Sequence, residues 1–296
     1  MASLEAMRYA DMLRHTPRMV DMQLCDQRAA GERAEDLTAL PAGISYQDTK
    51  AEGIAGLWAI PEHAAAGRAI LYLFGGGHVI SSIQARRKFG GHLANAAGCR
   101  VLIAGYRLAP EHPFPADVED AAAAYRLLLG QGYSPQGIAI GGESSAGGLT
   151  MSTLLALREA GSDLPSSAFL LSPWIDLSCA GETHLLNREL DLTATIAGLR
   201  RMAGQYLGAT DPRDPRVNAL FADLSNLPPL FVQVGGAEIL LDDSVQLVRR
   251  AAMHGTASTL EIWPDMQHFF QTAVGIFPEA GEALARVGRW IRDQSA

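Results

Sequence analysis

Short apolar segments alternate with helical patterns along most of the chain, and this alternation constrains the fold more than any other feature. From residue 54 onward the apolar segments are short, and most are bounded by Gly or Pro, as β-strands are. Segments that are apolar throughout suit strands buried on both faces of a sheet. The predicted strands are 54–60, 69–74, 101–106, 137–142, 167–172, 230–234 and 259–263.

Helical patterns fill the intervals between these strands. The predicted helices are 85–97, 118–129, 147–160, 243–254 and 280–293. Alternation of strands and helices predicts an α/β fold, with a mostly parallel sheet and helices on both of its faces. Binding and catalytic sites in such sheets lie beyond the carboxyl ends of the strands. A length of 296 residues is normal for one α/β enzyme, so we expect a single domain over 1–296.

Two segments interrupt the alternation. Residues 1–45 are helical in pattern and rich in Met, and residues 176–225 form a long, helix-containing insertion between two predicted strands. Met-rich helices serve most often in packing, but flexible Met side chains also suit a cap over an apolar pocket. We expect both segments to contribute to a helical cap.

The charge balance argues against several classes of partner. The net charge is −8, whereas binding to phosphate groups needs clustered Lys and Arg. The basic cluster Arg86-Arg87-Lys88 is short, and we interpret it as a solvated helix face. No apolar run approaches the roughly 18 residues that cross a bilayer. We therefore expect no nucleic-acid partner and no membrane span.

The cysteines and the first residues of the chain bear on metal binding and location. Cys25, Cys99 and Cys179 are far apart and show no CxxC or Cys/His ligand spacing, so we expect no metal site. Nothing in this pattern calls for an oxidising compartment, and the first residues lack the apolar core of a signal peptide. We expect a cytoplasmic protein, and the composition leaves homo-oligomerisation open.

A strand pattern ends and a helix pattern begins at the stretch GGESSAGG. A serine in such a tight turn is the arrangement called a nucleophile elbow, and small residues must stand two positions before and after it. Around Ser144 these positions hold Gly142 and Ala146, whereas Ser145 would place Glu143 at the crowded crossing. This rule favours Ser144 as the nucleophile and leaves Ser145 as the alternative. Helix-capping serines in a glycine-rich turn are the non-catalytic interpretation.

A serine nucleophile needs a base, and the base needs an orienting carboxylate. Glu238 follows the strand 230–234 by a few residues, and Asp242 lies further on, where a carboxylate would favour the helix dipole. We predict Glu238 as the acid, with Asp242 as the main alternative. His268 lies in the loop after the last predicted strand, and the chain order serine, acid, histidine is the one expected for this architecture.

The strand 69–74 is followed by Gly75-Gly76-Gly77. Glycines let backbone N–H groups point into a site, where they can stabilise an oxyanion. The chain has neither a GxGxxG nor a GxxxxGK[ST] pattern, so the glycines do not predict a phosphate-bearing cofactor.

One motif is more specific than the others. The stretch GYRLAPEHPFPA at 105–116 resembles the YRLAPE…FPA signature of the hormone-sensitive-lipase-like esterases, the bacterial family IV of the α/β-hydrolase superfamily. The glycine loop, the serine elbow, LLSPWIDL at 170–177, EILLDD and the His268 loop follow in that family's order. The resemblance covers roughly residues 45–295.

This resemblance implies an α/β-hydrolase fold with an eight-stranded sheet and a helical cap. It implies hydrolysis of carboxylic esters without a cofactor or metal, and we expect small-molecule esters with short acyl chains; lactones and amides remain alternative substrates. Carried over residue by residue, it implies Ser144 as nucleophile, Glu238 as acid, His268 as base, and the N–H groups of Gly76, Gly77 and Ser145 as the oxyanion hole.

The chain departs from the family pattern in three places. Ala146 stands where Gly is usual, and Glu238 stands where the acid is often Asp. Phe74 replaces the histidine that usually precedes the three glycines and helps to hold their loop, while His78 follows them. Either packing of Phe74 or a bond from His78 holds the loop, or the oxyanion hole is looser. A catalytically weakened small-molecule-binding homologue is therefore the rival hypothesis.

Overall fold

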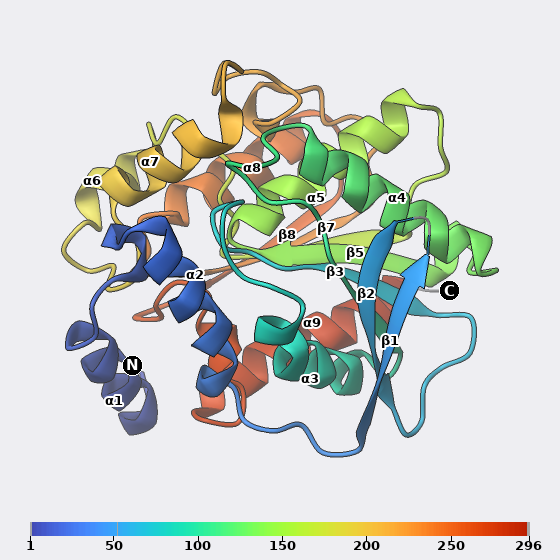
Figure 1. Ribbon diagram of the computed structural model, residues 1–296, viewed down its shortest axis with the longest axis horizontal. Coiled ribbons are helices and arrows are strands. Elements are labelled where there is room, and N and C mark those ends of the chain that lie inside the picture. The colour runs from blue at the N-terminus through green and yellow to red at the C-terminus, as the bar shows by residue number, and fades with distance from the viewer. Residues whose placement is uncertain (1, 52, 295–296) are drawn as a thin grey trace.

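An eight-stranded sheet runs through the middle of the molecule (Figure 1), in a computed structural model that describes residues 2–51 and 53–294. The strand order is β1-β2-β4-β3-β5-β6-β7-β8. β2 is antiparallel to both β1 and β4, and all other neighbours are parallel, so the predicted mostly parallel, eight-stranded sheet is confirmed. The strands are β1 Ile44–Ala51, β2 Ile54–Pro61, β3 Ala69–Leu73, β4 Arg100–Ala104, β5 Ile138–Glu143, β6 Ser167–Leu171, β7 Leu230–Gly235 and β8 Ser258–Trp263.

The seven strands expected from apolar runs are present, with ends that differ by two residues or fewer. The apolar pattern missed β1. Among the described residues this strand lies at the edge of the sheet and pairs only with β2, and it carries polar residues along most of its length. An edge strand has one neighbour and exposed faces, so it needs no continuous apolar run.

The helices cover both faces of this sheet (Figure 1). They are α1 Leu4–Arg14, α2 Leu24–Glu32, α3 Arg87–Ala97, α4 Ala116–Gly130, α5 Ser145–Glu159, α6 Glu182–Leu186, α7 Ile196–Leu207, α8 Leu241–Met253 and α9 Pro278–Gln294. Side chains alternate between the faces of a strand. Ile70 and Tyr72 of β3 share a buried cluster with Leu284 of α9, whereas Leu71 shares one with Leu149 of α5. No helix within residues 2–51 and 53–294 is long and apolar enough to cross a membrane.

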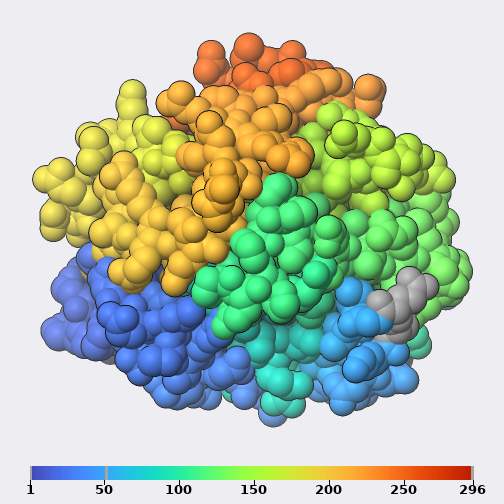
Figure 2. Space-filling model, turned by 45° about the horizontal axis from the view of Figure 1, so that its top comes forward, coloured from blue at the N-terminus to red at the C-terminus, as the bar shows by residue number. Residues whose placement is uncertain are grey.

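The N-terminal segment and the insertion after β6 lie side by side, as the blue and the yellow-to-orange surfaces in Figure 2 show. Thr195 donates a hydrogen bond to the Asp21 carboxylate at 2.9 Å, and Arg18 donates one to the Asp191 carbonyl at 3.0 Å. Val20 also packs against a buried apolar cluster that includes residues of α7. The assignment of these two segments, at about 1–45 and 176–225, as a helical cap stays a prediction.

Candidate active site

Ser144 occupies the turn between β5 and α5 in a strained backbone conformation. Its φ is 54° and its ψ is −125°, a combination that non-glycine residues adopt rarely and at a cost. Ser144 is half-buried, whereas the neighbouring Ser145 is helical and fully buried. A Cβ atom on Gly142 would lie 2.7 Å from the Ala146 Cβ, closer than real Cβ contacts. Strand and helix therefore cross so closely at this turn that position 142 requires glycine.

Glu238 and His268 form a hydrogen-bonded pair at the ends of β7 and β8. The Glu238 carboxylate is fully buried and accepts a hydrogen bond from His268 Nδ1 at 2.8 Å. Its other oxygen accepts from Ser172 Oγ at 2.6 Å and from the Gly235 N–H at 2.5 Å. Because a carboxylate only accepts, Nδ1 must carry the proton, and the Nε2 lone pair is left for another group.

The ends of adjacent strands join the elbow to this pair. The Ser144 N–H donates to the Leu171 carbonyl at 2.9 Å, at the end of β6. The next residue, Ser172, donates its hydroxyl to Glu238 and accepts a hydrogen bond from the Phe269 N–H at 3.0 Å. The three predicted catalytic residues thus belong to one set of strand ends, connected through Ser172.

Glu238 raises the pKa of His268 against the effect of burial. Burial lowers the pKa of His268, but the hydrogen bond and charge of Glu238 outweigh it, and the pKa lies above the ordinary value of 6.5. The carboxylate therefore favours the imidazolium form, which any base in this position must adopt after it accepts a proton.

Asp242, the alternative acid, lies elsewhere. It is in the first turn of α8, where its carboxylate accepts from the Glu182 N–H at 2.9 Å and from the Gln246 side chain at 2.8 Å. These hydrogen bonds connect Asp242 to α6 and to its own helix rather than to His268. Within the described residues, no group of three or more His, Cys, Asp or Glu side chains is placed to hold a metal ion.

The glycine loop after β3 offers unpaired backbone donors. Gly76 and Gly77 have φ values of 137° and 62°, which side-chain-bearing residues rarely adopt. In the described part of the chain, no group accepts a hydrogen bond from the N–H of Gly76, Gly77 or Ser145. Ser145 is the first residue of α5, where the helix leaves its N–H groups free. These three donors are the ones predicted for the oxyanion hole.

Phe74 is held by Tyr106, a residue of the GYRLAPEHPFPA motif. The two rings stack with centroids 4.5 Å apart, and the Tyr106 hydroxyl donates a hydrogen bond to the Phe74 carbonyl. Packing thus anchors the start of the glycine loop at the position where the family pattern has histidine.

Glu143, which precedes the elbow serine, connects that elbow to the glycine loop. Its fully buried carboxylate accepts from the Gly75 N–H at 2.7 Å, from the Tyr72 hydroxyl at 2.5 Å and from Arg86 Nε at 2.7 Å. Burial and the Glu143 charge raise the pKa of Tyr72 well above its ordinary value, so this phenol stays protonated and donates.

The prediction that Arg86-Arg87-Lys88 forms a solvated helix face is wrong for its first residue. The Arg86 side chain is only 11% exposed and pairs with Glu143. Burial lowers the pKa of Arg86, but the charge of Glu143, its hydrogen bond and contributions from nearby groups together outweigh burial, and the pKa rises above its ordinary value. The cation neutralises a buried carboxylate 57 residues away in sequence, which a local pattern of charges does not reveal.

Removing this cation should destabilise the fold strongly. We expect Arg86→Leu to lower the free energy of unfolding by about 3–5 kcal/mol, because the Glu143 charge is left buried without a counter-ion. Equilibrium unfolding in urea measures the change. Arg87→Leu is the matched control: its pair with Glu35 is partly exposed at 3.5 Å, and its stacking on Tyr46 is also near the surface. The free energy of unfolding of the control should fall by about 1 kcal/mol or less. An equal fall in Arg86→Leu and Arg87→Leu would contradict the prediction.

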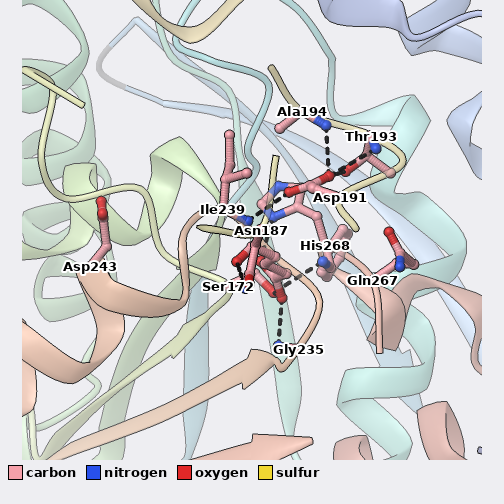
Figure 3. Close-up of polar contacts among 12 residues, drawn as sticks. Ser172, Asn187, Asp191, Thr193, Ala194, Gly235, Ile239, Asp243, Gln267 and His268 are labelled. Atoms are coloured by element: carbon pink, nitrogen blue, oxygen red, sulfur yellow. Dashed lines mark hydrogen bonds and ion pairs between the residues drawn. The ribbon is translucent and has the colours of Figure 1, made fainter. Parts of the chain in front are cut away.

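Further buried polar residues, which the sequence pattern did not indicate, lie near His268 (Figure 3). Asp191 is fully buried and accepts from the Ile239 N–H at 2.9 Å, and the side-chain amide of Asn187 donates to the Glu238 carbonyl at 2.8 Å. Gln267 binds both the N–H of Leu192 and the carbonyl of Leu190. The segment after β6 thereby holds the loops that carry Glu238 and His268.

Ser172 was also missed as a functional residue, although a signal for it existed. It lies in LLSPWIDL, directly after the last residue of β6, and the carboxyl ends of strands are where sites form in parallel sheets. Asp191 and Asn187 carry no such signal, because they lie outside the strand ends. Gln267 precedes His268 in the loop after β8, but it acts on the distant backbone of Leu190 and Leu192.

Comparison with known proteins agrees with this geometry. The family described as alpha/beta hydrolase fold matches residues 70–272. An acetyl-hydrolase of Streptomyces hygroscopicus is 44% identical over 226 residues, which are 76% of each chain. An ethyl acetate hydrolase of Pseudomonas putida is 32% identical over 240 residues, 76% of this chain and 72% of that protein.

Solved structures extend the similarity to the whole chain. The crystal structure of an esterase from the bacterial hormone-sensitive lipase family matches with a TM-score of 0.95 and 42% identity, and the match covers 100% of both chains. The chain therefore belongs to the α/β hydrolases and, within them, to the hormone-sensitive-lipase-like esterases, as a carboxylesterase-type hydrolase.

Proposed function

We propose that this carboxylic-ester hydrolase cleaves small, short-chain esters through an acyl-enzyme, with Ser144 as nucleophile, His268 as base and Glu238 as acid. The observation that carries the proposal is the buried Glu238–His268 hydrogen bond of 2.8 Å, connected through Ser172 to the strained elbow at Ser144. A positive φ at a non-glycine residue is costly and persists where the surrounding structure imposes it, often at active sites.

In this mechanism His268 Nε2 accepts the Ser144 hydroxyl proton while the serine oxygen attacks the ester carbonyl carbon. The carbonyl π electrons move to oxygen, and the N–H groups of Gly76, Gly77 and Ser145 stabilise the resulting oxyanion. The tetrahedral intermediate collapses, and the imidazolium protonates the leaving alcohol. Water, deprotonated by His268, then attacks the acyl-enzyme carbonyl. The second tetrahedral intermediate collapses, the imidazolium returns its proton to the Ser144 oxygen, and the carboxylic acid is released. Glu238 keeps the imidazole oriented and stabilises its cation throughout.

The preference for short acyl chains is supported by relatives whose names specify acetyl groups, the acetyl-hydrolase and the ethyl acetate hydrolase. We expect kcat/KM for p-nitrophenyl esters to be highest for acetate or butyrate and to fall by at least about tenfold at palmitate. A series of graded acyl length, extended with a bulky lactone and an amide, measures the preference. Strong activity confined to long acyl chains, to the lactone or to the amide would contradict it.

The rival hypothesis is a binding protein that has kept the fold and lost the chemistry. A fluorophosphonate probe distinguishes the two, because only an activated serine forms the covalent adduct. We expect one adduct per chain, located on Ser144 by peptide mass mapping and absent from a heat-denatured sample. An unlabelled native protein would favour the binding function.

The proposal also covers the cellular location, the class of substrate and the oligomeric state of the protein. The three cysteines are free, which is compatible with a reducing compartment, and we propose a cytoplasmic protein. The net charge of −8 supports a small-molecule substrate over a nucleic-acid partner. The state of homo-oligomerisation is open to measurement by light scattering.

A further inference from the structure

A buried histidine–carboxylate pair lies at the far end of the glycine loop, outside the proposed triad. His78 Nδ1 lies 2.9 Å from Asp117 Oδ2, and the two side chains are only 3% and 2% exposed. The Tyr206 hydroxyl donates to the other Asp117 oxygen at 3.1 Å. The rings of His78 and Tyr206 are stacked, with centroids 3.7 Å apart and planes within 5°. We call these three residues the His78 clamp.

The clamp is attached to the loop through the backbone of His78. The His78 N–H donates to Ser145 Oγ at 3.1 Å, and its carbonyl accepts from the Ala109 N–H at 3.0 Å. His78 has a φ of 63°, a left-handed conformation that non-glycine residues hold only when their surroundings impose it. His78 directly follows Gly77, so its position determines where the last donor of the loop points.

Asp117 is suited to hold this histidine. It lies in the first turn of α4, where the helix dipole favours a negative charge, and it also accepts a hydrogen bond from the Val118 N–H at 2.9 Å. A buried carboxylate needs donors, and it only accepts. The proton shared with His78 is therefore on Nδ1, and the ring orientation is determined.

Helix α7 closes the clamp over the loop. Tyr206 and Met202 both belong to this helix, one turn apart. The Met202 sulfur occupies the space that a Cβ on residue 77 would fill, so the helix contacts the loop directly. The donors of Gly76 and Gly77 are thus held between the Phe74–Tyr106 stack on one side and the His78 clamp on the other.

We propose that His78, with Asp117 and Tyr206, positions the oxyanion-hole donors and thereby supplies the anchoring that Phe74 cannot provide through a side-chain hydrogen bond. This inference rests on the proposed function. His78 acts through the loop backbone, so it is a positioning residue rather than a catalytic one. A loosened loop would weaken the tetrahedral state more than the bound ester, because the donors are aimed at the oxyanion.

The test uses His78→Phe, which keeps an aromatic ring next to Tyr206 and removes the bond to Asp117. With rates expressed per fluorophosphonate-titrated site, we expect kcat for p-nitrophenyl acetate to fall about tenfold or more and KM to change by less than about threefold. Affinity for a trifluoromethyl ketone, which forms a tetrahedral adduct on the serine, should fall in parallel with kcat/KM. A merely structural role would lower the number of active sites and leave kcat per site unchanged.

A second variant keeps the test valid if an unpaired Asp117 prevents folding. His78→Phe/Asp117→Ala removes the carboxylate together with its partner, so no buried charge is stranded. Since the two residues act as one unit, the double variant should lose about as much kcat as His78→Phe alone. A double variant with wild-type kcat per site would overturn the proposal.

The matched control is His254→Phe. His254 Nδ1 forms the same type of pair with Asp223 at 2.8 Å, but Asp223 is exposed and the pair lies away from the glycine loop. The His254→Phe variant should keep kcat within about twofold of wild type. If the wild type itself neither hydrolyses esters nor reacts with the fluorophosphonate, the proposed function fails. An active wild type with unchanged His78→Phe kinetics overturns the clamp alone.

Discussion

Ser144→Ala is expected to lower kcat for p-nitrophenyl acetate by a factor on the order of 10⁴ or more. The oxygen that would form the acyl-enzyme is lost, and the remaining oxyanion donors and binding contacts alone accelerate hydrolysis weakly. The substitution removes one hydroxyl from a half-buried residue whose side chain forms no hydrogen bond with the other described residues, so the protein should fold. Stopped-assay hydrolysis together with fluorophosphonate labelling measures both the rate and the loss of the adduct.

Ser145→Ala is the matched control for this prediction, because it removes a hydroxyl from the adjacent residue. The Ser145 hydroxyl accepts from the His78 N–H at 3.1 Å, whereas the predicted oxyanion donor is its backbone N–H, which alanine keeps. We expect a loss of no more than about tenfold. An inactive Ser145→Ala beside an active Ser144→Ala would reverse the assignment of the nucleophile.

Glu238→Ala should lower kcat/KM by about 10³–10⁴. The substitution removes the acceptor that holds His268 Nδ1 and the charge that stabilises the imidazolium. Asp242→Asn is the control for a carboxylate four residues along the chain, and it should change kcat/KM by less than about threefold. Loss of activity in Asp242→Asn with retention in Glu238→Ala would make Asp242 the acid.

The Glu238–His268 pair also determines how kcat/KM depends on pH. His268 acts as a base only when neutral, and its pKa is raised above 6.5 by Glu238 despite the opposing effect of burial. In the wild type, kcat/KM should therefore rise with pH through a limb centred above 6.5. Glu238→Gln removes the negative charge, so the limb of its residual activity should move to lower pH. An unchanged limb would mean that another group controls it.

Much of the fold was predictable because its signal is local. The inner strands of a sheet covered on both sides must be apolar on both faces, so they appear as apolar runs. β1 was missed because it is an edge strand with mostly polar residues, whereas β8, at the opposite edge, keeps enough apolar residues to be predicted. The helices were predicted with similar success, since their apolar periodicity depends only on the face that each turns to the sheet.

The residues of the candidate site also differ in whether a local sequence signal exists for them. Ser144, Glu238 and His268 were predicted because each follows a strand, and parallel strands bring their carboxyl ends together. Arg86, Asp191 and Gln267 could not be predicted, because each acts on a partner that is distant in sequence. For Arg86 that partner is Glu143, and only the packed structure shows the guanidinium to be buried.

The anchoring of the glycine loop shows most clearly which features depend on local sequence and which depend on tertiary contacts. The sequence alone determined that three glycines follow β3 and that Phe74 and His78 flank them. Only the tertiary structure decided how the loop is held, with Phe74 stacked on Tyr106 and His78 paired with Asp117 39 residues away. Local patterns report what each segment must bury, whereas a buried polar pair depends on where two segments meet.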